Sequence, residues 1–111
     1  MHARRESDGS ITVGLWVQAL HLNHQDAVHG GMVASLADNV MGYHAARALA
    51  SPVATVHLAV DYLARVSAGD WLEARSRIDR GGKRLLFAAC TGTAGGELVF
   101  RASAVFSAIR R

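Results

Sequence analysis

The stretch 29–42 combines residue types that can act on an acyl group. Asp38 follows a histidine and a glycine pair, and small residues surround it where a solvated helix face would carry long polar side chains. We therefore expect Asp38 to lie in a closed crevice, with an ordinary exposed aspartate as the alternative. We expect the amides of Gly30 and Gly31 to lie at a helix N-terminus, where backbone N–H groups lack intrahelical acceptors and can donate to an anion. Together these groups suit attack of water on an acyl carbon, with Asp38 as general base or nucleophile.

Two further polar residues precede this stretch, and one follows it. Asn23 and His29 lie before the helix, and Thr55 lies at the start of the next strand. At 1.5 Å per residue, Asp38 lies about 12 Å along the helix axis from Gly30. One helix cannot easily bring both groups onto the same small reacting centre, whereas two chains can. This spacing predicts a site at a subunit interface.

The element that must position these groups is a helix of roughly twenty residues. Its expected apolar stripe consists of Val33, Leu36, Ala37, Val40, Tyr43 and His44. The helix should end before Pro52, because the residue that precedes a proline disfavours the helical conformation.

Strands are expected on both sides of the helix. Residues 1–10 read as a loose polar start, and 11–21 read as a strand. After the helix the hydrophobic period becomes two, which indicates a half-buried strand. Its alternation sets Val56, Leu58, Val60 and Tyr62 against Thr55, His57, Ala59 and Asp61. Double glycines at 81–82 and 95–96 mark hairpins, so we expect an antiparallel meander of four strands after the helix.

The overall composition limits the classes of function. A chain of 111 residues, half of them hydrophobic, supports one domain spanning 1–111. Much of that half is alanine and valine, which favours burial through association with further copies. The chain has a net charge of +3 but no stripe of basic residues. This pattern argues against nucleic acid as a binding partner and fits a phosphorylated small molecule. Cys90 is the only cysteine, and neither a signal peptide nor a membrane span is evident, so a cytoplasmic location is expected.

Several short motifs resemble one known family. HLN, then HGG, then SLADN is similar to the pattern of the PaaI-type acyl-CoA thioesterases of the hotdog-fold superfamily. The resemblance runs from about residue 14 to residue 109, and it includes YLARVSAGDWLEA and RGGKRL. It implies a hotdog fold of class α+β, in which an antiparallel sheet wraps around one long helix. Asp26 and Arg65 depart from the family's pattern, which bears on acyl specificity more than on the chemistry.

The resemblance also implies roles for individual residues. Asp38 would activate water or attack the thioester, and the Gly30 amide would stabilise the oxyanion. The residues implied to position thioester and water are His29, Asn23 and Thr55. Gly31, Gly82, Lys83 and Arg84 are expected to bind the substrate, Lys83 and Arg84 through the phosphates of coenzyme A (CoA).

The implied activity is hydrolysis of a small aryl- or short- to medium-chain acyl-CoA, without metal or redox cofactor. The implied assembly is a homodimer or homotetramer with its active site at the subunit interface, and no membrane or nucleic acid as partner. Two alternatives remain open, a non-catalytic acyl-CoA binding module and a hotdog dehydratase or hydratase.

Overall fold

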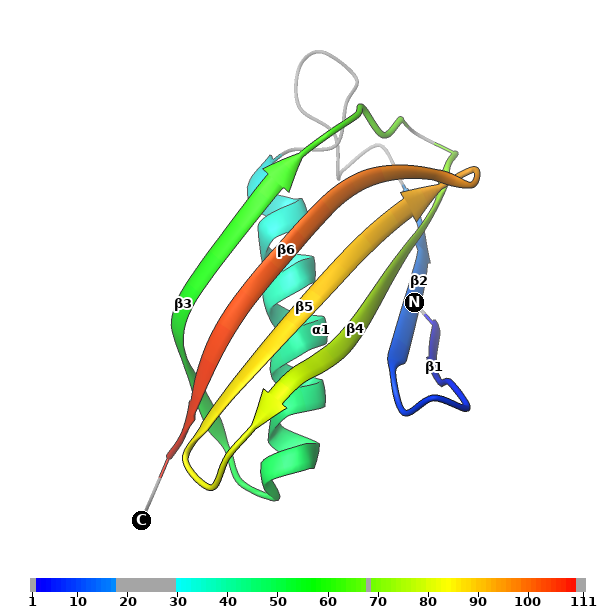
Figure 1. Cartoon of the computed structure of the whole chain (residues 1–111). Helices are drawn as coiled ribbons and strands as arrows, with labels where there is room; N and C mark the ends of the chain where they lie inside the picture. Colours follow the sequence, from blue (N-terminus) through cyan, green and yellow to red (C-terminus); the bar gives the residue numbers. More distant parts are fainter. Residues whose placement is uncertain (1, 18–29, 68, 110–111) are drawn as a thin grey trace.

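The computed structural model describes residues 2–17, 30–67 and 69–109, which form one helix and one antiparallel sheet (Figure 1). The helix is α1 (Gly30–Leu49), and the strands are β1 (His2–Arg5), β2 (Ile11–Trp16), β3 (Val53–Tyr62), β4 (Trp71–Gly81), β5 (Leu85–Ala94) and β6 (Glu97–Ala108). The strands lie in the order β1-β2-β4-β5-β6-β3, and the sheet curves around α1 (Figure 1). This is the expected hotdog arrangement.

One face of α1 packs against the sheet. Its buried residues are Val33, Leu36, Ala37, Val40, Met41, His44 and Ala45. The predicted stripe is therefore largely confirmed, but the prediction that Tyr43 belongs to it is wrong, since this side chain is 52% exposed. At 100° per residue, Tyr43 lies at the margin of the stripe rather than at its centre. The helix ends at Leu49, before Pro52, as predicted.

The concave face of the sheet supplies the rest of the core. Phe100 and Phe106 are the largest fully buried side chains, and both come from β6. A Cβ atom at Gly92 would lie 1.9 Å from the Phe100 ring, so the neighbouring strand must carry glycine there. None of the described segments forms a helix long and apolar enough to cross a membrane.

The predicted four-stranded meander is wrong in one respect. Strands β4, β5 and β6 follow one another as hairpins, but β3 pairs with β6 at the far edge of the sheet. The chain after β3 crosses the end of the molecule to reach β4, and the amides of Leu63 and Ala64 both donate to the Val99 carbonyl on the way. Alternation of side chains identifies strands, but it does not fix which strands become neighbours.

The prediction of a loose start at residues 1–10 is also wrong. Residues 2–5 form β1, which pairs antiparallel with β2 and opposes Ala3 to Val13 and Arg5 to Ile11. Asp8 closes the turn between these strands by accepting hydrogen bonds from the Ser10 amide at 3.0 Å and from its hydroxyl at 2.6 Å. The pairing uses main-chain groups, so polar side chains in β1 do not prevent it. The predicted strand 11–21 ends at Trp16, and 18–21 lie outside the described residues.

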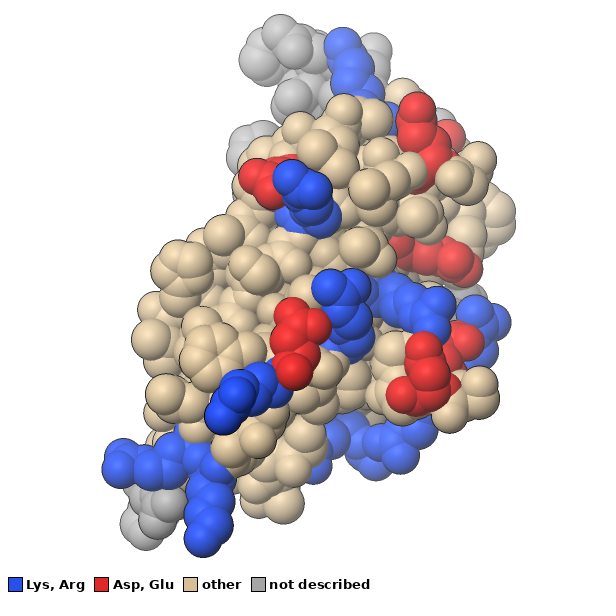
Figure 2. Space-filling model, viewed as in Figure 1, with Lys and Arg blue, Asp and Glu red and all other residues tan. Residues whose placement is uncertain are grey.

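The convex face of the sheet carries both signs of charge. Figure 2 shows acidic side chains next to basic ones over much of this face. The Arg101 guanidinium lies 2.9 Å from the Asp61 carboxylate, and that of Arg77 lies 3.0 Å from Asp79. These pairs are exposed, and such pairs contribute little to stability.

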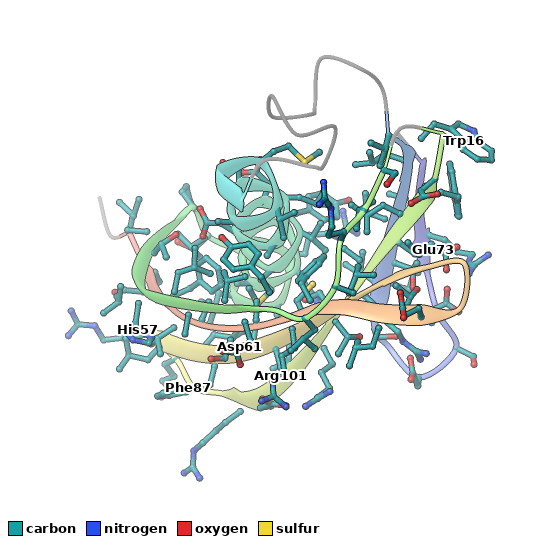
Figure 3. The ribbon with its side chains drawn as sticks, turned by 90° about the horizontal axis from the view of Figure 1, so that it is seen from above. Trp16, His57, Asp61, Glu73, Phe87 and Arg101 are labelled. Carbon is teal, nitrogen blue, oxygen red and sulfur yellow. The ribbon has the colours of Figure 1, made fainter. Side chains whose placement is uncertain are left out.

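A β-bulge in β3 overturns the predicted alternation at its start. The pairing of β3 with β6 shifts between Thr55 and His57, and Val56 in the bulge is 62% exposed. His57 and Asp61 lie on the convex face, away from α1 (Figure 3). Because one extra residue separates it from His57, Thr55 opposes the buried Phe106 and faces the helix. Of the four residues predicted on the inner face, only Leu58 and Val60 are half-buried, because β3 is an edge strand.

Candidate active site

The bulge in β3 brings Thr55 to the predicted carboxylate. The Thr55 hydroxyl donates a hydrogen bond to Asp38 Oδ1 at 2.8 Å. Asp38 is half-buried between the helix and the edge strand rather than enclosed. Among the described residues, the other carboxylate oxygen, Oδ2, has no hydrogen-bonding partner. The hydroxyl therefore fixes one oxygen of Asp38 and, among the described residues, leaves the second one unpaired.

The other end of β3 contacts the start of α1. The Tyr62 hydroxyl, at the last position of β3, donates a hydrogen bond to the Gly30 carbonyl at 2.8 Å. Gly30 is the first residue of α1, so its amide belongs to the helix N-terminus, where amides have no intrahelical acceptor. A Cβ atom at Gly30 would lie 3.5 Å from the Tyr62 ring, an ordinary contact distance. The tyrosine thus holds the backbone whose amide is predicted to bind the oxyanion.

A pocket of about 240 Å³ lies beside Gly30. Its lining is mostly apolar and consists of Gly30, Val33, Tyr62, Ala64, Arg65, Val66, Val99 and Phe100. Arg65 is exposed, whereas Val66, Val99 and Phe100 are buried. An apolar pocket beside an amide of the helix N-terminus suits the acyl part of a thioester.

Within one chain these two groups of residues stay apart. Gly30 and Asp38 lie about 12 Å apart along the axis of α1 at 1.5 Å per residue. Tyr62 holds the first, and Thr55 holds the second. Asn23 and His29 lie outside the described residues, so the structure brings together only Asp38 and Thr55 of the predicted catalytic set.

The predicted CoA contacts lie at the opposite end of the molecule from Gly30. Gly82, Lys83 and Arg84 form the turn between β4 and β5, near the C-terminal end of α1 (Figure 1). The Gly82 amide donates to the Leu85 carbonyl at 2.9 Å and closes the turn. Lys83 and Arg84 are both exposed, and Figure 2 shows basic side chains projecting from this end. Gly31, in contrast, lies in the first turn of α1.

Two other titratable groups lie in the core, away from Asp38. His44 Nδ1 lies 3.0 Å from the Ser76 hydroxyl, and burial lowers the pKa of His44, chiefly through desolvation. Burial also raises the pKa of the Cys90 thiol to about 12. Neither group has the exposure that a catalytic residue needs. Among the described residues, no three His, Cys, Asp or Glu side chains lie close enough to hold a metal ion.

Tyr62 was missed by reasoning from sequence as a residue of the site. The expected place of Tyr62 was the core or an interface, and in the structure its side chain is 56% exposed. Its position at the very end of the strand after the helix is the signal that could have identified it. The apolar lining from Val66 and Val99 had no such signal, because any core valine looks the same in sequence.

Sequence comparisons assign a family to the chain. A sequence model of the thioesterase superfamily matches residues 25–100. A Pseudomonas aeruginosa protein named "putative esterase" is 37% identical over 105 residues, covering 93% of this chain and 78% of that protein. A Caenorhabditis elegans protein of the same description is 38% identical over 79 residues, covering 67% of this chain and 44% of that protein.

Solved structures share the fold. A Streptococcus pneumoniae protein described as a hypothetical thioesterase with coenzyme A has a TM-score of 0.90 at 21% identity, over 99% of this chain and 89% of that one. The Escherichia coli PaaI protein has a TM-score of 0.83 at 23% identity, over 91% of this chain and 73% of that one. The fold and the family match agree, and we conclude that this chain belongs to the thioesterase superfamily and is a thioester hydrolase.

Proposed function

We propose that this protein hydrolyses acyl-CoA thioesters through water activated by Asp38, in an active site completed by a second copy of the chain. The observation that carries the proposal is the Thr55–Asp38 hydrogen bond of 2.8 Å beside an edge strand. It orients a half-buried carboxylate at the side of the molecule where another chain can pair. The solved relative described with coenzyme A supports CoA as the carrier.

The edge strand β3 supplies the surface for that second copy. It is ten residues long, it pairs with β6 on one side only, and it exposes Val56 and Tyr62. Long exposed edge strands pair readily with a second strand, and a twofold axis makes such pairing self-complementary. In antiparallel pairing the end of one strand lies beside the start of the other. Gly30 contacts the end of β3, and Asp38 contacts its start. When two copies of β3 pair, the partner's Gly30 therefore approaches Asp38.

The reaction then follows from these groups. Asp38 Oδ2 accepts a proton from a water molecule, and the water oxygen attacks the thioester carbonyl carbon. The amide of the partner's Gly30 donates to the developing oxyanion, a contribution typically worth about 10²–10³ in rate. The tetrahedral intermediate collapses, the C–S bond breaks, and the CoA thiolate takes the proton from Asp38. Acid and CoA are the products, and Asp38 is ionised again.

The remaining predicted residues complete the proposed site. His29 and Asn23 position the thioester and the water, and Gly31 lies beside the oxyanion amide. Lys83 and Arg84, with Gly82 in the same turn, contact the nucleotide phosphates of CoA. The pocket of about 240 Å³ beside Gly30 limits the acyl group to a small aryl or a short to medium chain.

A panel of acyl-CoA substrates tests the proposal through release of free thiol. We expect turnover of phenylacetyl-, short- and medium-chain acyl-CoA, with long chains disfavoured. A thiol reagent is suitable for this assay because the only cysteine, Cys90, is buried and its pKa is raised to about 12. Binding of these thioesters without turnover would contradict hydrolysis and favour a binding module. Turnover of a 3-hydroxyacyl-CoA or enoyl-CoA without thiol release would favour a dehydratase or hydratase.

A further inference from the structure

A second groove lies on the opposite side of α1 from Asp38. It separates the helix from β1 and β2, and its volume is about 300 Å³. Its floor consists of Val13, Leu36 and Val40, and its rim of Ala3, Asn39 and Tyr43. The floor residues are at most 6% exposed, so the groove offers apolar surface over a packed core.

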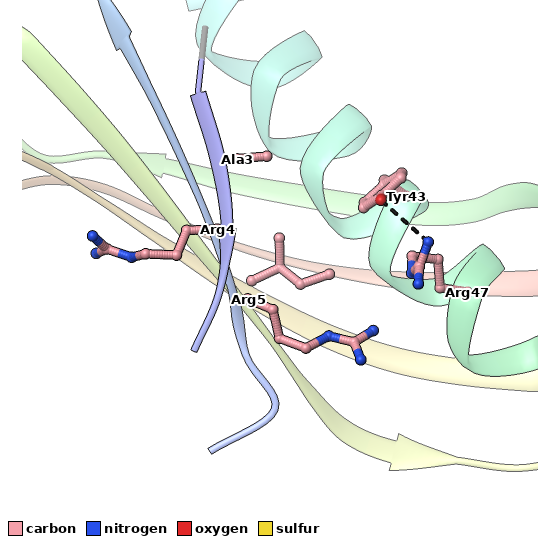
Figure 4. Close-up of a pocket in the computed structure, with 6 residues that line it drawn as sticks. Ala3, Arg4, Arg5, Tyr43 and Arg47 are labelled. Carbon is pink, nitrogen blue, oxygen red and sulfur yellow. Dashed lines mark hydrogen bonds between the residues drawn. The ribbon is translucent and has the colours of Figure 1, made fainter. Parts of the chain in front are cut away.

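One end of this groove carries positive charge. Ala3 and Tyr43 also line an adjoining cleft of about 170 Å³, together with Arg4, Arg5, Ile11 and Arg47. Arg5 extends from β1 toward the helix, whereas Arg4 points the other way and pairs with Glu6 (Figure 4). Among the described residues, Arg5 has no ion-pair partner, and no carboxylate lines either the groove or the cleft.

Tyr43 holds the second arginine at the junction of the two cavities. Arg47 Nη1 donates a hydrogen bond to the Tyr43 hydroxyl at 3.4 Å, and its guanidinium carbon lies 5.6 Å from the centre of the Tyr43 ring. Figure 4 shows this pair across the cleft from Arg5. Two guanidinium groups therefore border the end of an apolar channel, and guanidinium groups match the geometry of a carboxylate.

This groove is separate from the proposed active site. Tyr43 follows Asp38 by five residues, which turns it by about 140° around the helix axis. Asp38 faces β3 at one edge of the sheet, whereas the groove faces β1 at the other edge. A ligand in the groove therefore does not overlap with a thioester at Asp38.

We propose that the groove between α1 and β1 binds an amphipathic carboxylate of medium chain length, with its carboxylate between Arg5 and Arg47 and its alkyl chain over Val13, Leu36 and Val40. The apolar floor and the two cations at one end match the two parts of such a molecule. The proposal rests on these residues and does not depend on the reaction at Asp38.

Titration calorimetry with octanoate tests the proposal, with 1-octanol and acetate as probes of the tail and the head alone. We expect octanoate to bind more tightly than either. R5Q/R47Q should weaken octanoate binding by about tenfold or more and leave 1-octanol binding unchanged, because only the charged contact is lost. The matched control R77Q/R80Q removes the same charge from the exposed part of β4 and should leave octanoate binding within about twofold of wild type.

Two further measurements locate the alkyl chain. Ala3 is exposed on an edge strand, so A3F should fill the groove without disturbing the fold and abolish binding of both octanoate and 1-octanol. In the wild-type protein, octanoate should shift the methyl resonances of Val13, Leu36 and Val40. Octanoate binding that persists in R5Q/R47Q, that falls equally in R77Q/R80Q, or that leaves these methyl resonances unmoved would overturn the proposal.

Discussion

Helix α1 carries two polar side chains that each contact a hydroxyl on a strand, and their surroundings are opposite. His44 is 6% exposed and lies 3.0 Å from Ser76 on the internal strand β4. Asp38 is half-buried, and its partner Thr55 lies on the edge strand β3. The first pair is closed to other molecules. The second can be reached by a substrate and by a second chain.

Under the proposed mechanism, this difference assigns stability to the first pair and chemistry to the second. A buried polar group must be paired, because leaving it unpaired costs about 1–3 kcal/mol. His44 and Ser76 satisfy one another, so this pair contributes to the core. Thr55 fixes one oxygen of Asp38, and the other has no hydrogen-bonding partner among the described residues. Changes at the edge pair should therefore affect rate, and changes at the core pair should affect stability.

The largest expected effect is that of D38N. Asparagine has nearly the same shape and still accepts the hydrogen bond from Thr55, so the fold should persist. It cannot accept the proton from water, so kcat should fall by roughly several hundredfold or more. Steady-state assays of thiol release measure this effect. A variant that keeps more than about a tenth of the wild-type kcat would show that Asp38 is not the catalytic group.

Removing one hydroxyl from each pair sharpens the comparison. T55A should lower kcat about tenfold, because a hydrogen bond to a charged group is lost, and it should leave stability nearly unchanged. S76A should lower the free energy of unfolding by about 1–3 kcal/mol, because His44 loses its partner in the core. Its kcat should match that of the wild type. Urea unfolding measures stability, and thiol release measures kcat. A T55A variant that loses stability but not activity, or an S76A variant that loses activity but not stability, would contradict these separate roles.

The sequence alone accounts for much of this arrangement. The periodicity of 3.6 gives the helix and most of its buried face, and the double glycines give both hairpins among β4, β5 and β6. These signals are local, so they can be read without knowing the partners of each strand. The small residues around Asp38 likewise suggest the chemistry that we propose there.

The parts that the sequence did not predict depend on pairing. The bulge at Val56 reverses the face of Thr55, and no turn residue or glycine marks it. Strand β1 forms because its main chain completes the pairing of β2, while its side chains look like those of a polar tail. The position of β3 beside β6 depends on contacts between residues far apart in sequence. Alternation places Tyr62 on the apolar face of β3, but β3 is an edge strand, so this side chain is exposed.

The core pair also predicts how stability varies with pH. Burial lowers the pKa of His44 below its usual 6.5, so the unfolded chain binds a proton where the folded one does not. Stability should therefore be complete above this usual value and decrease as the pH falls below it, by at most about 1.4 kcal/mol per pH unit for one group. H44Q should reduce this slope between pH 7 and pH 5. Equal slopes in wild type and H44Q would contradict this role.

The smallest expected effect lies at the turn between β4 and β5. Lys83 and Arg84 are exposed, and they are proposed to contact phosphates far from the reacting carbon. K83A/R84A should raise KM for acyl-CoA roughly several-fold, and this effect should become smaller as the salt concentration increases. Hydrolysis of the matching acyl-pantetheine, which lacks the nucleotide, should be unchanged. Equal losses on both substrates would indicate a structural role for this turn.

The central claim is that Asp38 of one chain works with Gly30 of another, and a mixed dimer tests it most directly. G30P removes the amide hydrogen and keeps a backbone that the first helical position tolerates. Each of the homodimers of G30P and D38N should be nearly inactive. A doubly tagged heterodimer of the two variants contains one intact site, so we expect about half of the wild-type activity per dimer. A heterodimer no more active than its parents, or a fully active wild-type monomer in sedimentation, would contradict the shared site.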